Sequence, residues 1–292
     1  MDNQHQQRRA FAYGLSAVAL WSTVATGFKL GLQIMAPAQL LLIGTCISTA
    51  IFWAAALRTG QTRLTVTGRK HALLFALINP FAYYLVLFEA YDRLPAHVAQ
   101  PLNYTWAIVL AILAVPWLGQ RLSLRTTTGI GVGYAGVLVL LSQGNFTRMP
   151  STDWLGVGLA LFSTLLWAGY WLMNTRTREP PVALMAWSFL YSLPLLAIAC
   201  AIGPGLPRLS VPALAYGAWV GCIELGFTFL LWQQALRLTD NAARIGQLIF
   251  LAPFLSFAMI ATVLGEAIHF TSIVGLAIIV TGLFITRTPQ TG

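Results

Sequence analysis

Amide and aromatic side chains stand inside long apolar stretches of this sequence, where a polar group is costly unless it finds a partner. Asn79 and Tyr83 are four residues apart, and Gln100 precedes Asn103 by three. In a helix each of these pairs lies on one face. Aromatic rings stack on a flat solute for about 0.5–1.5 kcal/mol per ring pair, and amides pair with an ammonium or a carboxylate without a buried charge. We therefore predict a cavity that binds a flat amphipathic solute. Its predicted lining residues are Trp21, Ser22, Asn79, Tyr83, Gln100, Asn103, Tyr104, Trp167, Tyr170, Trp171 and Gln247.

A structural role would explain the same residue types. Trp and Tyr form interfacial belts in membrane proteins, and Asn or Gln can simply hydrogen-bond neighbouring helices together. Pro80, directly after Asn79, removes one helical hydrogen bond and is expected to kink its segment, either around a cavity or for packing alone.

Two charged residues are further candidates for a role in binding or coupling. Glu224 is the one carboxylate with apolar sequence on both sides, so it is a candidate proton carrier for coupled transport. Alternatively, Glu224 reaches water near the outer third of its segment. Lys29 ends the first apolar stretch, where we expect its ammonium to extend to the membrane interface rather than bind a substrate carboxylate.

Catalytic, metal and cofactor motifs are missing from the sequence. An intramembrane enzyme would need paired catalytic groups, and the apolar stretches offer one lone glutamate and no nucleophile with a base. The four histidines are scattered over predicted loops and termini, without metal-ligand spacing. Gly131, Gly133 and Gly136 fit a dinucleotide-binding pattern, but they stand inside an apolar segment, where close helix packing explains them better. We predict neither an enzyme nor a bound metal or cofactor.

The elements that position these residues follow from composition. Of 292 residues, 58% are hydrophobic and 9% are charged, which excludes a soluble globular enzyme. Ten stretches of 18 to 28 residues are almost free of charge, and a helix needs about 20 residues to cross a membrane. We therefore predict an all-α membrane protein of ten transmembrane helices. The stretches are 10–28, 30–57, 71–88, 94–120, 126–147, 154–175, 180–207, 209–236, 245–265 and 267–286.

The basic residues set the predicted orientation. With the N-terminus in the cytoplasm, thirteen Lys and Arg residues fall in cytoplasmic loops or termini, and four fall outside. The four are Lys29, Arg93, Arg148 and Arg208. This bias places both termini in the cytoplasm, and it explains the net charge of +9 without nucleic-acid binding.

An internal repeat divides the chain into predicted halves, residues 1–147 and 148–292. Leu20-Trp21, Leu118-Gly119, Gly129 and Gly136 each recur 146 positions later. Five helices per copy is an odd number, so the second copy must be inverted in the membrane. The predicted cytoplasmic corner LGQRLSLR contains two arginines, and its counterpart LGEAIHFT contains none. Inverted repeats give a bundle two equivalent packings around a central site, which is the basis of alternating access.

Three segments carry a resemblance to a known family. They are WSTVATGFK (21–29), the run 90–123 that ends in WLGQRLS, and its echo 235–269 that ends in LGEAIH. These segments resemble the drug/metabolite transporter superfamily, specifically its ten-helix EamA-type exporters. The chain departs from that pattern at Gln120, where the family usually has Glu, whereas the second copy retains Glu266.

The resemblance implies a bacterial inner-membrane exporter, and the density of aromatic residues favours aromatic or hydrophobic amino acids as its substrates. An exporter of another small metabolite or a drug is the alternative. A receptor or a channel also fits the hydropathy, but the sequence has no soluble domain, charge ring or filter-like loop. The expected partners are a small-molecule substrate and the lipid bilayer, and the expected state is a monomer.

Overall fold

The computed structural model describes residues 3–119, 123–145, 152–239 and 242–286, and this part of the chain is helical without a strand. Nine of its helices are long and apolar enough to cross a membrane, and a further apolar helix, Phe270–Thr286, has 17 residues. The predicted all-α, multi-pass membrane class is therefore confirmed. The corner residues Gln120 and Arg121 lie outside the described residues.

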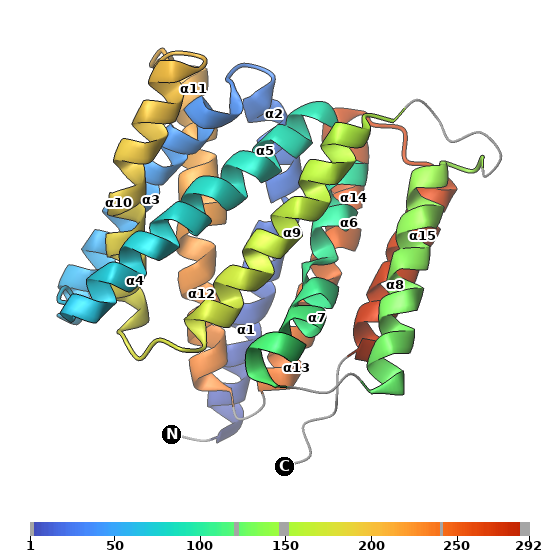
Figure 1. Cartoon of the computed structure of the whole chain (residues 1–292), viewed down its shortest axis with the longest axis horizontal. Coiled ribbons are helices and arrows are strands. Elements are labelled where there is room, and N and C mark those ends of the chain that lie inside the picture. The colour runs from blue at the N-terminus through green and yellow to red at the C-terminus, as the bar shows by residue number, and fades with distance from the viewer. Residues whose placement is uncertain (1–2, 120–122, 146–151, 240–241, 287–292) are drawn as a thin grey trace. The chain divides into compact units, whose positions relative to one another are not determined.

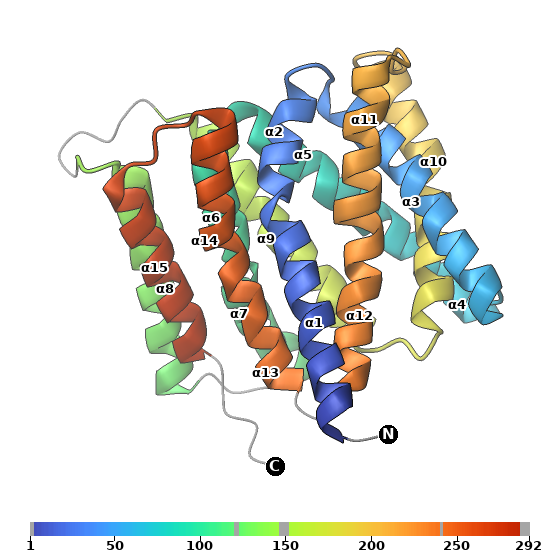
Figure 2. The same ribbon diagram turned by 180° about the vertical axis from the view of Figure 1, so that it is seen from behind.

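The helices group into two compact units, each built from two separate stretches of chain (Figures 1 and 2). The first unit comprises Met1–Phe81 and Glu179–Gly265, and the second comprises Ala82–Arg178 and Glu266–Gly292. The helices of the first unit are α1 (Asn3–Ser22), α2 (Val24–Leu32), α3 (Pro37–Thr59), α4 (Val66–Ala76), α10 (Pro181–Ile202), α11 (Val211–Trp219), η2 (Val220–Phe227), α12 (Thr228–Leu238), α13 (Ala242–Gln247), η3 (Leu248–Leu251), α14 (Ala252–Met259) and η4 (Ile260–Leu264). Those of the second are α5 (Tyr83–Arg93), α6 (Ala96–Tyr104), α7 (Trp106–Leu118), α8 (Leu124–Ser142), α9 (Trp154–Asn174) and α15 (Phe270–Thr286).

In the first unit, α3 packs against α10 and η2, while α1 packs against α12 and α14 (Figure 1). Small residues let α3 approach η2 closely, because a Cβ on Gly221 would lie 2.5 Å from the carbonyl oxygen of Gly44. At the same contact the hydroxyl of Ser48 lies 2.8 Å from the carbonyl oxygen of Gly221. Close backbone approach with a buried polar contact is how helices associate in lipid.

The third membrane segment is bent where the sequence predicts a kink. Segment η1 (Leu77–Ala82) joins α4 to α5, and Asn79 within it has the non-helical angles φ −141° and ψ 117°. The peptide bond between Asn79 and Pro80 is cis. Because Asn79 is not helical, the four-residue spacing does not place it on one helical face with Tyr83, and the prediction of a shared face is wrong for this pair.

In the second unit, α9 packs against α5, α6 and α7, and α8 packs along α15. Glycines allow the second contact. A Cβ on Gly129 would lie 2.7 Å from the carbonyl oxygen of Gly282, and one on Gly136 would lie 2.7 Å from that of Gly275. As numbering rises along α8 it falls along α15, so the two helices are antiparallel, and both views show them side by side (Figures 1 and 2).

Side-chain caps fix several helix starts. The hydroxyl of Ser123 accepts a hydrogen bond from the N–H of Thr126 at 3.1 Å. The carboxylate of Asp153 accepts one from the N–H of Gly156 at 3.0 Å. Such caps satisfy backbone donors that the first helical turn leaves unpaired. They set the beginnings of α8 and α9.

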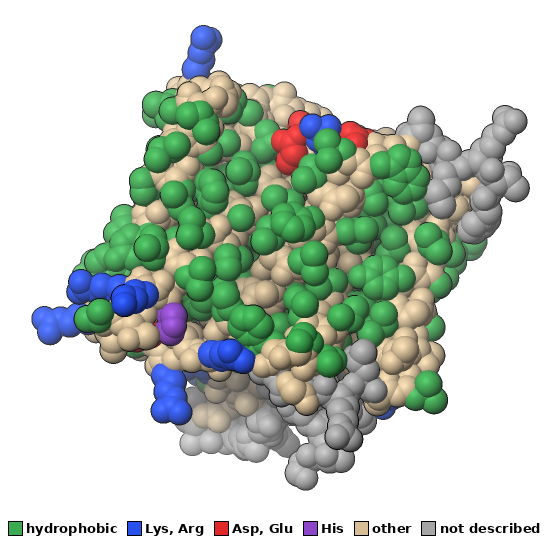
Figure 3. Space-filling view, in the orientation of Figure 1, with side chains coloured by type: hydrophobic (Ala, Val, Ile, Leu, Met, Phe, Trp, Pro, Cys, Tyr) green, Lys and Arg blue, Asp and Glu red, His purple; other side chains and the backbone are tan. Residues whose placement is uncertain are grey.

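Large apolar side chains remain exposed on the outside of the helices. Leu57, Ile202 and Phe270 are examples, and hydrophobic side chains are spread over most of the face drawn in Figure 3. Lys and Arg side chains project mainly from its margins (Figure 3). An apolar exterior on this scale is expected where lipid, not water, is the solvent.

Candidate functional site

The second unit gathers four of the predicted aromatic residues into one cluster. The ring of Trp167 stacks on that of Tyr83, with centroids 4.6 Å apart and planes at 26°. On α9 the ring of Tyr170 stacks on Trp167 at 5.7 Å and 25°, and Trp171 meets Trp167 edge-on at 5.9 Å. Residues three and four apart on a helix share a face, which is why α9 can present all three rings together.

Asn103 ties this aromatic cluster to α6. Its carbonyl oxygen accepts a hydrogen bond from the hydroxyl of Tyr83 at 3.4 Å, and its amide nitrogen donates to the hydroxyl of Ser163 at 3.0 Å. Asn103 therefore joins α5, α6 and α9, and part of its hydrogen-bonding capacity is used in doing so. The next residue, Tyr104, is half-buried at the end of α6.

Two predicted amides have buried oxygens without a partner. Among the described residues, neither the side-chain oxygen of Gln100 nor that of Asn79 has a hydrogen-bond partner. Gln100 is 4% exposed in the second unit, and Asn79 is 3% exposed in the first. An unsatisfied buried acceptor costs about 1–3 kcal/mol, so each oxygen favours an incoming donor such as an ammonium group.

The remaining predicted residues lie in the first unit. The ring of Trp21 contacts two rings of α12, Phe229 at 5.7 Å and Trp232 at 5.4 Å. The hydroxyl of Ser22 donates to the carbonyl oxygen of Ala19 in its own helix at 2.6 Å. Gln247 is exposed at the end of α13. Of these three, Trp21 is the one that joins an aromatic group.

The charged candidates also lie in the first unit. Glu224 is half-buried within η2, and Lys29 is half-buried within α2. Roles for Glu224 in proton coupling and for Lys29 at the interface stay predictions.

One polar pair was not identified from the sequence. The carboxylate of Glu266 accepts hydrogen bonds from the backbone N–H groups of Ala96 at 2.9 Å and His97 at 3.2 Å, and it lies 2.7 Å from Nδ1 of His97. Burial alone would raise the pKa of Glu266, but these hydrogen bonds and the His97 ring outweigh it and hold the pKa below its ordinary value. Glu266 thus caps the N-terminus of α6.

The location of His97 differs from the sequence prediction of a loop or terminus, because His97 lies buried in the first turn of α6. The sequence did single out Glu266, as the family's retained glutamate at this corner. It gave no sign of the partner, since 169 residues separate the two positions.

A family model matches the chain twice, over residues 8–142 and 154–288, and its description is "EamA-like transporter family". The chain belongs to the EamA-like transporter family. The two matches of this EamA-like transporter are offset by 146 residues, the same spacing as the internal repeat. The protein is therefore a multi-pass membrane transporter with a two-repeat sequence.

Several curated proteins are similar to this EamA-like transporter over almost their whole length. A protein of Escherichia coli K12 named "Probable amino-acid metabolite efflux pump" is 26% identical, over 95% of this chain and 94% of its own. One from Streptantibioticus cattleyicolor named "Probable terminal-alkyne amino-acid exporter" is 23% identical, over 92% and 90%. A solved crystal structure with a TM-score of 0.67 and 22% identity covers 95% of this chain and 96% of its own, and shows a shared fold.

Proposed function

We propose that this EamA-like transporter exports an aromatic or other hydrophobic amino acid across a bacterial inner membrane by alternating access. The observation that carries the proposal is the aromatic cluster of Tyr83, Trp167, Tyr170 and Trp171 beside the amide of Asn103. Rings that stack on one another offer faces and edges to a further ring, at about 0.5–1.5 kcal/mol per pair.

The polar end of an amino acid would need donors and acceptors near those rings. The buried oxygen of Gln100 is an acceptor that an ammonium could satisfy, and Gln100 lies on α6 with Asn103. The pattern of aromatic residues, together with the Trp21, Asn79 and Tyr83 region, resembles the aromatic amino acid exporter YddG. The names of two relatives, an amino-acid metabolite efflux pump and an amino-acid exporter, favour the same substrate class.

Alternating access requires two equivalent packings, and the contact between α8 and α15 supports an inverted repeat. Gly129 and Gly275 are equivalent positions of the repeat, as are Gly136 and Gly282. Gly129 packs on Gly282, and Gly136 packs on Gly275. Exchanging each residue for its repeat equivalent turns one contact into the other, as a two-fold axis between antiparallel helices requires.

The proposed orientation of the chain in the membrane and its location rest on the charge bias. Lys and Arg concentrate in alternate loops, which favours cytoplasmic termini in a bacterial inner membrane. With the termini in the cytoplasm, the first and second repeats have opposite orientations.

Counterflow in proteoliposomes tests the substrate class. We expect internal unlabelled phenylalanine to drive uptake of labelled phenylalanine and tryptophan, with less uptake of threonine and none of an unrelated dye. Exchange of the dye alone would favour the alternative, an exporter of drugs or other metabolites. Absence of exchange for phenylalanine and tryptophan would contradict the proposed substrate class.

A variant pair connects the measurement to the aromatic cluster. Trp167→Leu removes the ring that contacts Tyr83, Tyr170 and Trp171. Loss of two ring contacts with the solute, at about 0.7 kcal/mol each, should reduce phenylalanine counterflow about tenfold. Trp154→Leu is the matched control, because Trp154 is exposed at the start of the same helix. An equal loss of phenylalanine counterflow in both variants would show that the aromatic cluster is not the cause of the effect.

A further inference from the structure

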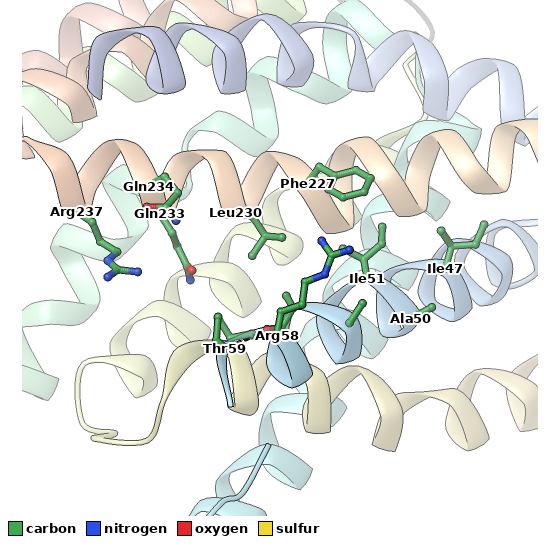
Figure 4. Close-up of a pocket in the computed structure, with 13 residues that line it drawn as sticks. Ile47, Ala50, Ile51, Arg58, Thr59, Phe227, Leu230, Gln233, Gln234 and Arg237 are labelled. Atoms are coloured by element: carbon green, nitrogen blue, oxygen red, sulfur yellow. Dashed lines mark hydrogen bonds between the residues drawn. The ribbon is translucent and has the colours of Figure 1, made fainter. Parts of the chain in front are cut away.

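A groove lies within the first unit, away from the aromatic cluster of α9. It runs between α3 and α12, with Val182 of α10 on one side, and encloses about 670 Å³ (Figure 4). Sites for small molecules and cofactors span about 300–1,000 Å³, so the groove is large enough for a ligand.

The lining changes from apolar to basic along the groove. On α3 it runs from Ile47 to Arg58, and on the opposite side from Phe227 of η2 to Arg237 of α12. At about 1.5 Å per residue, each side is roughly 15–17 Å long. That length is about half of a hydrocarbon core of about 30 Å, so it matches the depth of one leaflet of a bilayer.

Small residues create the space along α3. Ala50, Ala54 and Arg58 follow one another at four-residue intervals, line the groove and are exposed. A stripe of alanine leaves room beside the helix that a larger side chain would fill. Across from it, Phe227 and Leu230 provide an apolar wall.

Both arginines at the basic end are available to an anion. In Figure 4 the side chain of Arg58 extends between α3 and α12 toward Ile51 and Phe227, and Arg237 lies at the far end of α12, beyond Gln233 and Gln234. Within the described part of the chain, neither guanidinium has a hydrogen-bond or ion-pair partner, and no carboxylate lines the groove. Gln233 and Gln234 add amides near this end.

We propose that this groove binds an anionic phospholipid, with its headgroup toward the arginines that line the groove, Arg58 and Arg237, and an acyl chain along Ile47, Ile51 and Phe227. A transported amino acid would use the guanidinium end but would leave most of the apolar length empty. A phospholipid fills both, because its charged headgroup stands at one end and its acyl chain extends through the depth of one leaflet. Basic pockets between membrane helices recognise anionic headgroups in this way.

Native mass spectrometry of the purified full chain tests the proposal. Phosphatidylglycerol and phosphatidylcholine with identical acyl chains are titrated in detergent, and inorganic phosphate is titrated separately. We expect phosphatidylglycerol to be retained preferentially. Arg58→Gln and Arg237→Gln should each weaken its binding about fivefold, and Ala54→Trp should weaken binding of the lipid by occupying the chain's path.

A double variant, Arg8→Gln with Arg63→Gln, is the matched control, because it removes two exposed arginines of the same unit that do not line the groove. It should leave lipid binding within twofold of the unmodified protein. Circular dichroism and thermal unfolding verify that each variant folds, and Ala54 is exposed, so the tryptophan has space.

Four results would overturn the proposal. Equal retention of the two lipids would exclude recognition of negative charge. An equal loss of phosphatidylglycerol binding in the control double variant would show that the effect depends on net charge and not on the groove. Competition by inorganic phosphate at the concentration of the lipid would indicate a phosphate site without a chain. Displacement of phosphatidylglycerol by phenylalanine would make the groove part of the solute's path.

Discussion

Single side chains cap the ends of helices in this protein, and Glu266 is an example at the start of α6. Its carboxylate binds two backbone N–H groups and the ring of His97 at the start of α6. The carboxyl is 17% exposed, so water screens these bonds only in part. The cap therefore fixes the position of the helix that contains Gln100 and Asn103.

Glu266→Gln should lower stability at neutral pH by about 1–2 kcal/mol, because it removes a charged acceptor from three hydrogen bonds. The native pKa of Glu266 lies below its ordinary value of 4.5, so the charged cap stabilises the fold fully above that value and less as pH falls through the native pKa. Thermal unfolding between pH 3 and pH 8 should show this acid-side loss in the unmodified protein and a smaller one in Glu266→Gln.

Glu89→Gln is the control for that measurement. Glu89 pairs with Arg93 one turn away, and both side chains are more than a third exposed. Exposed pairs of this kind contribute about 0–1 kcal/mol. If Glu89→Gln reduced stability and its pH dependence as much as Glu266→Gln does, the cap would have no special role.

Glu224 tests whether export is coupled to protons. If its carboxyl group carries the proton, Glu224→Gln should abolish the response of phenylalanine counterflow to a pH gradient while the protein still binds the solute. The measurement compares counterflow with and without the gradient in the same liposomes. Unchanged transport and unchanged pH dependence in the variant would end this hypothesis.

At the residue scale the sequence named Trp167, Tyr170 and Trp171 as lining residues of a cavity, and the structure brings their rings into contact. That these rings bind a solute stays a prediction. The predicted shared face of Asn79 and Tyr83 was wrong, because the backbone at Asn79 is not helical. Periodicity describes a regular helix and says nothing of a local break or of a partner far away in sequence.

At the scale of elements, the contact between α8 and α15 depends on glycine. Gly136→Ala should destabilise the protein by about 1–3 kcal/mol, because its Cβ would lie 2.7 Å from two backbone atoms of α15, the carbonyl oxygen of Gly275 and the nitrogen of Ile279. Thermal unfolding in detergent measures the change.

Gly131→Ala is the matched control on the same helix. A Cβ on Gly131 would have no atom within 4 Å, so alanine should leave stability unchanged or raise it by up to about 1 kcal/mol through helix propensity. Equal destabilisation by the two variants would contradict the glycine contact as the cause.

Charge-free stretches predicted where the membrane segments lie, but not how they break. The first segment divides at Thr23, whose hydroxyl donates to the carbonyl oxygen of Leu20 at 2.6 Å. The fourth divides at Thr105, whose hydroxyl donates to that of Leu102 at 2.7 Å. Such bonds to the preceding turn can bend a helix, and an ordinary hydropathy pattern does not reveal which threonine makes one.

At the scale of the whole molecule, the two sequence repeats do not coincide with the two compact units of the structure. The family model matches two ranges 146 residues apart, the spacing that the leucine, tryptophan and glycine pairs predict. Each compact unit nevertheless takes segments from both predicted halves. Sequence similarity shows which positions of the two repeats correspond. It does not show which helices of one repeat pack with helices of the other.

The proposed mechanism requires that the two repeats have opposite orientations in the membrane, and the accessibility of equivalent positions measures this. Ser123 and His269 are 146 positions apart, are exposed and immediately precede α8 and α15. In a chain whose three native cysteines are replaced, Ser123→Cys and His269→Cys are labelled with a membrane-impermeant maleimide in intact spheroplasts and in inverted vesicles. The account predicts labelling of His269→Cys in spheroplasts and of Ser123→Cys in inverted vesicles. Labelling of both from the same side would contradict it.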